Sequence, residues 1–501
     1  MKKMHRNSVA IAIMSCLATW SSSGLAYDLK EAAQEAALRN PEVVSKWHAF
    51  REANQNIDVA RGGYFPKVDL STGIKREHLD EAGAAGRNVR YTTRGTSLFL
   101  NQMIFDGFAT KSEVERLSYA QRVRYFEMLD KTSETALEAA RAYNDVLRYR
   151  KLAQLAEENY IQHRAIHEQI SRRVKAGVGR QVDLEQAGGR LALAESNLLV
   201  ETSNLHDVSA RFQRIVGKAP PAAIREPALL NKEIPKTKAE AVTIAYQNNP
   251  ALLAAQENIV AATAEARGTN AAFMPKVYFQ ARHDLGHKVD GIDNPPDSSL
   301  TSYGLVLNYN LYNGGSDSAR KRQYAERVNI AKDLRDKACV DIRQGVSIGF
   351  NDLKKLAEQI EYLDQHQLSS EKARDAYRKQ FDIGQRTLLD LLDTENELFQ
   401  ARRAYRNALH DQFLAYARTQ AGMGKLLQQM GLQQLEAEGL AKQEEVADFD
   451  PLAVCPPEGE LAVTVDKDKI FADALKARPE LLPPQQPAAP APSSAKVPAK
   501  K

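Results

Sequence analysis

The sequence is poor in the residues that mark several common protein classes. It has three cysteines and two tryptophans in 501 residues, and aromatic residues make up 7%. After Cys16, the remaining cysteines, Cys339 and Cys455, lie far apart in unlike surroundings. That spacing argues against a disulfide framework, even in an oxidising compartment. Beyond the first 26 residues no stretch has eighteen consecutive apolar residues, so no membrane-spanning helix is predicted.

A strong excess of charge of either sign is also missing. The formal net charge is +4 at pH 7, and Lys2, Lys3 and Arg6 account for most of it. A chain that is close to neutral beyond these residues gives no reason to expect a nucleic acid as a partner. Ala, Leu, Gln, Glu, Arg and Lys dominate instead, which is typical of long helices and coiled coils.

Residues 1–26 have the features of an export signal. A positive start precedes a short apolar core, Val9 to Trp20, and the small-residue cleavage site Gly24-Leu25-Ala26 follows. The apolar core is too short to span a bilayer. Cleavage before Cys16, with lipidation of that cysteine, is the alternative, but Ile13-Met14-Ser15 matches the required small-residue pattern poorly. We therefore expect residues 1–26 to be a signal peptide.

Five landmarks of the sequence occur twice, at a nearly constant offset of 207 or 209 residues. An offset with so little drift predicts a tandem duplication, with repeats at about 27–217 and 218–432. The matching pairs are Arg39-Asn40-Pro41 with Asn248-Asn249-Pro250, Phe65-Pro66-Lys67-Val68 with Met274-Pro275-Lys276-Val277, Phe105-Asp106-Gly107 with Tyr312-Asn313-Gly314, Gly177 and Asp183 with Gly384 and Asp390, and Gly217-Lys218 with Gly424-Lys425.

Each repeat is expected to contain the same elements in the same order. Heptad seams of apolar residues predict the long helices, and alternation of apolar and polar residues predicts the strands. The first repeat should have a helix over 28–61, strands at about 67–77 and 91–105, a long helix over 108–174 and a return helix over 181–216. The second should have a helix over 238–272, strands at about 276–286 and 301–312, a long helix over 316–381 and a return helix over 387–430.

The tail, residues 433–501, departs from this plan. It is acidic at first and then rich in Pro, Ala and Lys, a composition that predicts disorder. The fold class expected for the rest is α+β and predominantly helical.

Strands of about ten residues have the length needed to cross an outer membrane. A sheet of four strands leaves its edges unpaired, and each unpaired backbone group in lipid costs several kcal/mol. Several chains must therefore share one closed barrel if the strands lie in a membrane. A periplasmic coiled-coil scaffold with two small sheets and no pore remains the alternative at this point.

The combined features resemble the TolC-type outer membrane channel family over about residues 28–432. The features that carry this resemblance are the export signal, the tandem duplication, FPKV and MPKV before strands, FDG and YNGG after strands, and GxxxxxD at both helix corners. The resemblance implies a homotrimer in the outer membrane of a Gram-negative bacterium. Its twelve-stranded barrel would lie in lipid and continue as a twelve-helix tunnel in the periplasm.

The resemblance also implies partners and a function. A periplasmic adaptor protein and an inner membrane transporter would deliver the exported substrate. The stretch from Phe381 to Tyr405 is most similar to the branch of type I protein secretion, which uses an ATP-binding cassette (ABC) transporter. Small-molecule efflux with a proton-driven pump of the resistance-nodulation-division (RND) type stays open as an alternative.

The two glycine corners, 175–187 and 381–393, form the candidate functional site. The resemblance places them at the periplasmic tips of the tunnel, where it closes and where the adaptor docks. The residues of the tip turns are Gly177, Val178, Gly179, Ile383, Gly384 and Gln385. As an alternative, the glycines are plain helix stops that tolerate a positive φ.

A gate is implied at the same place. In the family an arginine at the position of Arg386 pairs with an aspartate at the position of Asp183 on a neighbouring chain. An aromatic hydroxyl at the position of Phe381 assists, but phenylalanine lacks that hydroxyl, which puts this part of the gate in doubt. Asp183 can also be a plain first-turn carboxylate favoured by the helix dipole.

Asp390 and Asp393 lie three residues apart and so share one face of a helix. The resemblance places both in the lumen, where three chains would form two acidic rings. Like charges in such rings repel each other, and the rings attract cations. The alternatives are a solvated acidic face and, for Asp390, a capping box with Thr387.

Residues for catalysis or for a cofactor are not indicated. His163 and His167 lie four apart but lack the glutamate of a zinc protease motif, and we expect both at the surface. AGVGRQ is not followed by the Lys-Ser/Thr of a phosphate-binding loop. The sequence therefore predicts no enzyme, no metal site and no cofactor.

Overall fold

The computed structural model describes residues 27–80, 88–290, 298–438, 440, 450–455 and 465–478. The chain divides into two compact units, Met1–Pro457 and Glu458–Lys501. The expected signal peptide, with Cys16, lies outside the described residues. In the second unit the structure describes one helix, α11 (Lys467–Ala477). The other described helices and strands belong to the first unit.

The first half of this unit begins with two helices and ends with a helical hairpin. Its elements are α1 (Leu29–Arg39), α2 (Pro41–Arg61), the 3-10 turn η1 (Gly62–Tyr64), β1 (Lys67–Asp80), β2 (Asn88–Phe105), α3 (Ala109–Lys175) and α4 (Gln181–Val216).

The second half repeats the order of these seven elements and adds two short helices at its end. Its long helix contains 67 residues, as α3 does. Its elements are α5 (Lys238–Asn248), α6 (Pro250–Gly268), the 3-10 turn η2 (Thr269–Phe273), β3 (Lys276–Asp290), β4 (Ser298–Asn308), α7 (Ser316–Asp382), α8 (Leu388–Gly422), α9 (Leu426–Met430) and α10 (Pro451–Val454).

The helices expected over 28–61 and 238–272 are each broken in two, which corrects the sequence expectation. The breaks lie at Asn40 and Asn249, each followed by a proline at the first helical position. Asn40 accepts a hydrogen bond from the backbone N of Glu42 at 2.9 Å, and Asn249 accepts one from a backbone N two residues on at 3.0 Å. Proline lacks an N–H and disfavours helix at the preceding residue, so each pair ends one helix and caps the next.

The tail is more ordered than its composition predicted. Besides α10 and α11, the backbone N of Gln433 donates to Gln34 Oε1 at 2.7 Å. Trp47 Nε1 donates to the carbonyl of Glu436 at 2.9 Å. The expectation of disorder from residue 433 onwards is therefore wrong for these segments. At Gln433 and Glu436 the reason is that side chains of the first two helices bind the tail backbone.

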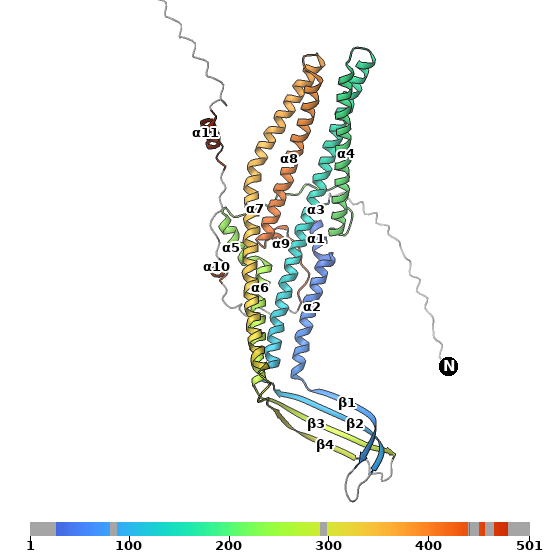
Figure 1. Cartoon of the computed structure of the whole chain (residues 1–501), viewed down its shortest axis with the longest axis vertical. Helices are drawn as coiled ribbons and strands as arrows, with labels where there is room; N and C mark the ends of the chain where they lie inside the picture. Colours follow the sequence, from blue (N-terminus) through green and yellow to red (C-terminus); the bar gives the residue numbers. More distant parts are fainter. Residues whose placement is uncertain are drawn as a thin grey trace, which may run out of the picture. The chain divides into compact units, whose positions relative to one another are not determined.

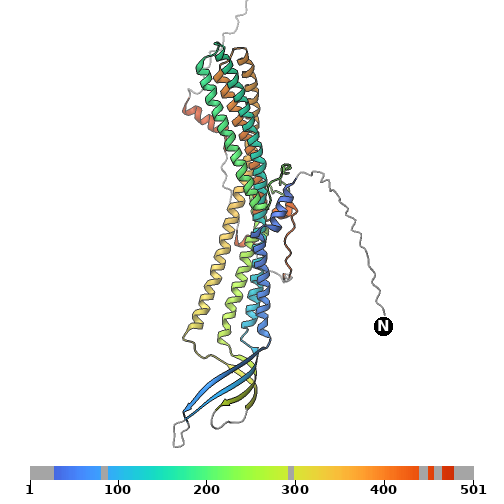
Figure 2. The same ribbon diagram turned by 90° about the vertical axis from the view of Figure 1, so that its right-hand side faces the viewer.

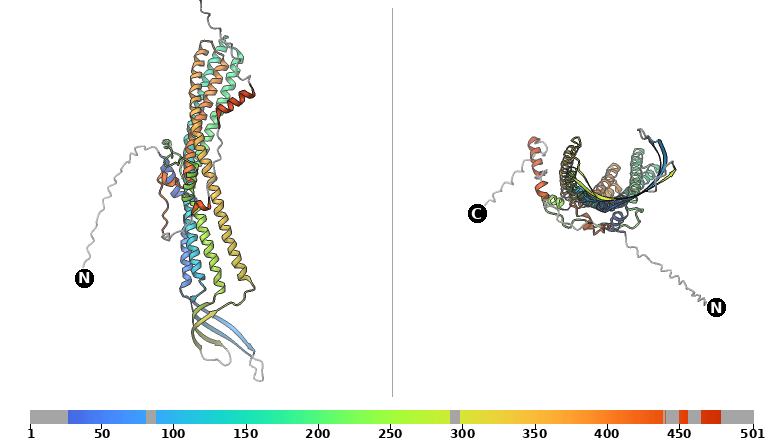
Figure 3. Two further views of the ribbon diagram at one scale, coloured as in Figure 1. Left: turned by 90° about the vertical axis from the view of Figure 1, so that its left-hand side faces the viewer. Right: turned by 90° about the horizontal axis from the view of Figure 1, so that it is seen from below.

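The four strands form one antiparallel sheet in the order β1-β2-β3-β4, at the opposite end of the helices from the two helix corners (Figure 1). β1, β2 and β3 are longer than expected, whereas β4 ends at Asn308 rather than near 312. One face carries exposed apolar side chains, among them Leu70, Tyr303 and Leu305, which are 71%, 79% and 70% exposed. The sheet curves, as the view from below shows (Figure 3).

Helix α3 is central to the helical part. It contacts α2 and α6, as well as α4 and α8, while α7 contacts α6 and α8. Figure 2 shows the two hairpins, α3 with α4 and α7 with α8, running side by side toward the corners. Hydrophobic cores lie around α1, with Tyr143 and Phe212 fully buried, around α5, with Tyr246, and near the corners, with Ile166 and Leu391.

Cys339 on α7 and Cys455 after α10 form a disulfide, with a Cα–Cα distance of 5.7 Å. The expectation against a disulfide is therefore wrong. Cys455 is 2% exposed and lies in the hydrophobic core around α5 together with Tyr246 and Met423. Folding brings the tail back onto this core, and a separation of 116 residues carries no sign of that contact.

Candidate functional site at the helix corners

The two corners share one backbone design. The helix before each corner ends at Lys175 or Asp382, and the glycine that follows, Gly177 or Gly384, has φ of +75° or +76°. No described atom beyond the chain neighbours lies within 4 Å of a Cβ built at either glycine. The left-handed backbone, and not close packing, therefore requires glycine here.

Gly179 is needed for a different reason. A Cβ at this position would lie 2.9 Å from the backbone N of Val174, so the turn folds tightly over the end of α3. The side chains beside these glycines point outward: Val178 is 79% exposed and Ile383 is 69% exposed, and Gln385 is exposed as well. Exposed apolar side chains at a chain reversal are suited to contact with another protein.

Asp183 and Arg386 do not meet within one chain. Asp183 accepts two hydrogen bonds from Arg180, at 2.9 and 3.1 Å. Arg386 donates from Nε to Gln380 Oε1 at 3.0 Å and lies with its guanidinium 4.3 Å from the centre of the Tyr377 ring. Each side chain is thus bonded within its own hairpin, and the pair between neighbouring chains stays a prediction.

Phe381 is a core residue of the corner. It is 6% exposed and packs in a cluster that contains Ile170 of α3 and Leu388 of α8. The Arg173 guanidinium lies 5.5 Å from the centre of its ring, a cation–π contact. Phe381 therefore joins α7 to α3 and α8 near the tips, whatever it contributes to a gate.

The two aspartates assigned to acidic rings have different surroundings. Asp390 forms the capping box with Thr387, whose hydroxyl accepts a hydrogen bond from the Asp390 backbone N at 3.2 Å. Asp393 accepts a hydrogen bond from Arg190 of α4 at 2.5 Å. The rings stay a prediction, and within one chain the charge of Asp393 has a counter-ion.

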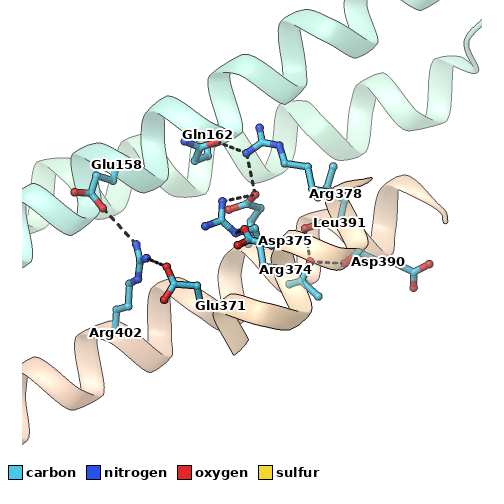
Figure 4. A network of polar contacts seen from close by, with 11 residues as sticks. Glu158, Gln162, Glu371, Arg374, Asp375, Arg378, Asp390, Leu391 and Arg402 are labelled. Carbon is cyan, nitrogen blue, oxygen red and sulfur yellow. Dashed lines mark hydrogen bonds and ion pairs between the residues drawn. The ribbon is translucent and has the colours of Figure 1, made fainter. Parts of the chain in front are cut away.

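The sequence did not predict a network of polar contacts that joins the two hairpins and the helices of the second one (Figure 4). Arg378 of α7 donates to Gln162 of α3 at 2.8 Å. Arg402 of α8 donates to Glu158 of α3 at 3.5 Å and to Glu371 of α7 at 2.7 Å. These residues had the charge and spacing of ordinary heptad positions, so no sequence signal distinguished them.

Glu395 lies in the middle of this network. It is 5% exposed, and its Oε1 lies 3.7 Å from both Arg374 and Arg378. Burial raises the pKa of the Glu395 carboxyl, and the charges of Arg374 and Arg378 offset part of that rise. A cavity of about 190 Å³ lies beside it, also lined by Gln162 and Arg402.

His163 is buried, which corrects its expected place at the surface. It is 3% exposed, and burial together with the charge of Arg190 lowers its pKa to about 4. A neutral imidazole in a packed helix face has a structural role. His167 lies half-buried.

Among the described residues, no group of three His, Cys, Asp or Glu side chains is placed to hold a metal ion.

The helices in the described part of the chain include none that is both long and apolar enough to cross a membrane.

Comparison with known proteins gives one consistent family. A family model described as "Outer membrane efflux protein" matches residues 32–218 and 241–425. The outer membrane efflux protein BepC of Brucella suis is 27% identical over 432 residues, covering 85% of this chain and 91% of the relative. The outer membrane protein TolC of Escherichia coli is 25% identical over 454 residues, covering 86% and 88%. The proteases secretion protein PrtF of Dickeya chrysanthemi is 23% identical over 422 residues, covering 80% and 88%.

A solved structure shows the same fold. The outer-membrane channel OprN superposes with a TM-score of 0.69 at 17% identity, covering 79% of this chain and 90% of that chain. The sheet at one end of long helical hairpins is therefore an arrangement found in an outer membrane channel.

Proposed function

The chain belongs to the outer membrane efflux protein family of TolC-type channels, and from this premise we propose that it is the exit duct of a secretion system. It is an outer membrane protein that extends into the periplasm. A substrate delivered by an inner membrane transporter and a periplasmic adaptor would pass through it without any chemical step. The observation that supports this proposal most directly is the sheet with an exposed apolar face at one end of the 67-residue helices.

We propose that the chain forms a homotrimer, because the open sheet needs strands of other chains to close it. In the described part of the chain, β1 and β4 each pair on one side only, and a free edge in lipid is costly. Three chains would close a twelve-stranded barrel and a twelve-helix tunnel. The matching order of the elements in the two halves and the equal lengths of α3 and α7 support an internal duplication. Two similar halves in each chain would make such a ring nearly regular.

The corners would form the closed end of the duct. Asp183 of one chain would pair with Arg386 of its neighbour, beside Phe381. An exposed pair contributes only about 0–1 kcal/mol, so an adaptor that docks on the tip turns, at Val178 and Ile383, could separate three of them. Asp390 and Asp393 would form acidic rings just inside and favour cations.

Type I protein secretion with an ABC transporter is the branch we favour. The resemblance of the stretch from Phe381 to Tyr405 supports it, as does the relative PrtF, which is named for protease secretion. The alternative, small-molecule efflux with a proton-driven RND pump, is supported by the relative BepC, which is named for efflux.

A deletion strain separates the branches. The secretion proposal predicts that one or a few proteins disappear from the culture medium while sensitivity to toxic small molecules stays unchanged. Increased drug sensitivity with unchanged secreted protein would instead establish efflux. A strain that carries the Arg386→Ser variant is the control, because a channel with a weakened gate should still export its substrate. Unchanged secretion and unchanged sensitivity after deletion would contradict the export function.

A further inference from the structure

The two faces of the sheet differ in how their charges are balanced. On one face the Arg282 side chain donates a hydrogen bond to Asp284 at 2.8 Å, and the Tyr91 hydroxyl is hydrogen-bonded to the side chain of Glu77. These two acids are thus bonded to side chains beside them. The opposite face carries the exposed apolar side chains, and its charges are arranged differently.

Alternate residues of each strand form this apolar face, because successive side chains of a strand point to opposite sides. Residues directly opposite each other on paired strands share a face, as the hydrogen bond of 3.2 Å between the hydroxyls of Thr72 and Thr96 shows. Beyond Ile74, toward the end of β1, the face changes from apolar to basic. Its residues there, which we call the basic patch, are Arg76, His78, Arg90, Arg94 and His287.

Pairing of the strands brings the residues of the basic patch together. Arg94 of β2 is opposite His287 of β3. Arg90 of β2 is opposite His78 of β1, and Arg76 precedes His78 by two residues on the same face. Residues two apart are separated by about 7 Å along a strand, so the five side chains occupy a short stretch of the sheet.

The positive charge of the basic patch has little compensation. Arg76, Arg90 and Arg94 are exposed, and in the described part of the chain none of the three has an ion-pair partner. Among the described side chains of this face the only acid is Asp80, which lies 3.9 Å from His78. An arginine on a lipid-facing strand is costly at the middle of a membrane but much less so near its surface, which suits these arginines to the level of the headgroups.

The position of the basic patch along the sheet agrees with that level. It lies toward the end of the sheet that is far from the helices (Figure 1). Because the chain is an outer membrane protein that extends into the periplasm, this end would face the outer leaflet in the proposed duct. The apolar stretch from Val68 to Ile74 separates the patch from the helices and is about 20 Å long, as an apolar band in lipid would be.

We propose that the basic patch binds the phosphate groups of the phosphorylated glycolipid of the outer leaflet, lipopolysaccharide. This inference rests on the proposed function, because it requires the strands to lie in the outer membrane. Clusters of basic side chains at a membrane surface bind anionic headgroups. A guanidinium also matches a phosphate with two parallel hydrogen bonds.

The spacing of the arginines favours a glycolipid over an ordinary phospholipid. Arg76, Arg90 and Arg94 lie on different rungs of the sheet, so one phosphate cannot reach all three. A headgroup with several phosphates can bind two or three of them at once, whereas most phospholipids carry a single phosphate. The second and third contacts of one headgroup are then intramolecular and strengthen binding.

Binding of lipopolysaccharide without its O-chain to the purified mature protein in neutral detergent tests the inference. The triple variant Arg76→Gln, Arg90→Gln, Arg94→Gln should bind about 100-fold more weakly than the wild type, since each arginine near an anionic surface contributes about a fivefold factor. The matched control Lys67→Gln, Lys75→Gln, Lys276→Gln removes the same charge from the other face and should bind like the wild type. Enzymatic removal of the lipid phosphates should weaken binding to the wild type as the triple variant does.

Equal binding by the wild type and the triple variant would overturn the inference. Phosphatidylglycerol that binds the wild type as tightly as lipopolysaccharide would overturn the choice of the glycolipid. Conductance in bilayers of neutral lipid separates these outcomes from failure of the duct. The wild type and both triple variants should form pores there, and a wild type without any current would overturn the proposed function together with the inference.

Discussion

The second hairpin, α7 with α8, is held differently at its base and at its tip. At the base the Cys339–Cys455 disulfide fastens α7 to the tail. Nearer the tip, ion pairs such as Arg190–Asp393 and Arg402–Glu158 join it to the first hairpin. In the tip turn Arg386 is bonded within α7 and α8. Within one chain the hairpins are thus joined close to the tips, at Asp393 and Phe381, whereas Arg386 in the tip turn is bonded within its own hairpin. In the proposed duct the tip turns would make the contacts between chains.

The apolar cluster near the tips should give the largest effect if it fastens the hairpins. Phe381→Ala removes a large buried side chain and should lower the free energy of unfolding by about 3–5 kcal/mol. Thermal or denaturant unfolding followed by circular dichroism measures this. Ile383→Ala, an exposed change two residues away, should stay within about 0.5 kcal/mol, and an equal loss for both variants would contradict a buried role for Phe381.

Loss of the Cys339–Cys455 disulfide should have the second largest effect on stability. Cys339→Ser should lower stability by about 2–4 kcal/mol and expose the chain between residues 433 and 455 to proteases. Limited proteolysis with and without reductant measures this. Wild-type protein treated with reductant should behave like the variant, and resistance of both to cleavage would show that the bond does not hold the tail.

Removal of one ion pair between the two hairpins should have a smaller effect. Arg190→Ala breaks a partly exposed pair and should lower stability by about 1 kcal/mol or less. Hydrogen exchange of α8 around Asp393 should quicken, because α8 loses a contact with α4. Arg180→Ala, which breaks a pair within one hairpin, is the control and should leave exchange in α8 unchanged.

Glu395 should make the contact between the two hairpins sensitive to pH. Its folded-state pKa is raised by burial, so the folded state favours the protonated carboxyl. Below its ordinary value of 4.5 both states are protonated and no difference arises. As pH rises through the folded-state pKa, the wild type should lose stability relative to Glu395→Gln. Unfolding curves of both proteins from pH 4 to 8 measure this, and a difference independent of pH would contradict the assignment.

Local patterns in the sequence predicted most of the helical plan. The long helices expected over 108–174 and 316–381 are observed at Ala109–Lys175 and Ser316–Asp382. They could be predicted closely because heptad seams and glycine stops are local features of the sequence. The breaks before Pro41 and Pro250 were also readable from proline chemistry, but the regular helical pattern on either side concealed them.

Contacts between distant segments could not be predicted in the same way. The buried state of His163, the network around Glu395 and the disulfide of Cys339 each depend on segments that meet only in the folded chain. The corner residues were located by resemblance, and the described contacts give several of them a further structural role, as the capping by Asp390 and the packing of Phe381 show.

Single-channel recording of the purified mature protein in a planar lipid bilayer tests the central claim most directly. The account predicts small, cation-selective currents that grow when Arg386→Ser weakens the gate. Lys175→Ser, which removes an equal charge from the other corner, should leave them small. A protein that stays soluble without detergent and gives no current would contradict a channel and leave the periplasmic scaffold.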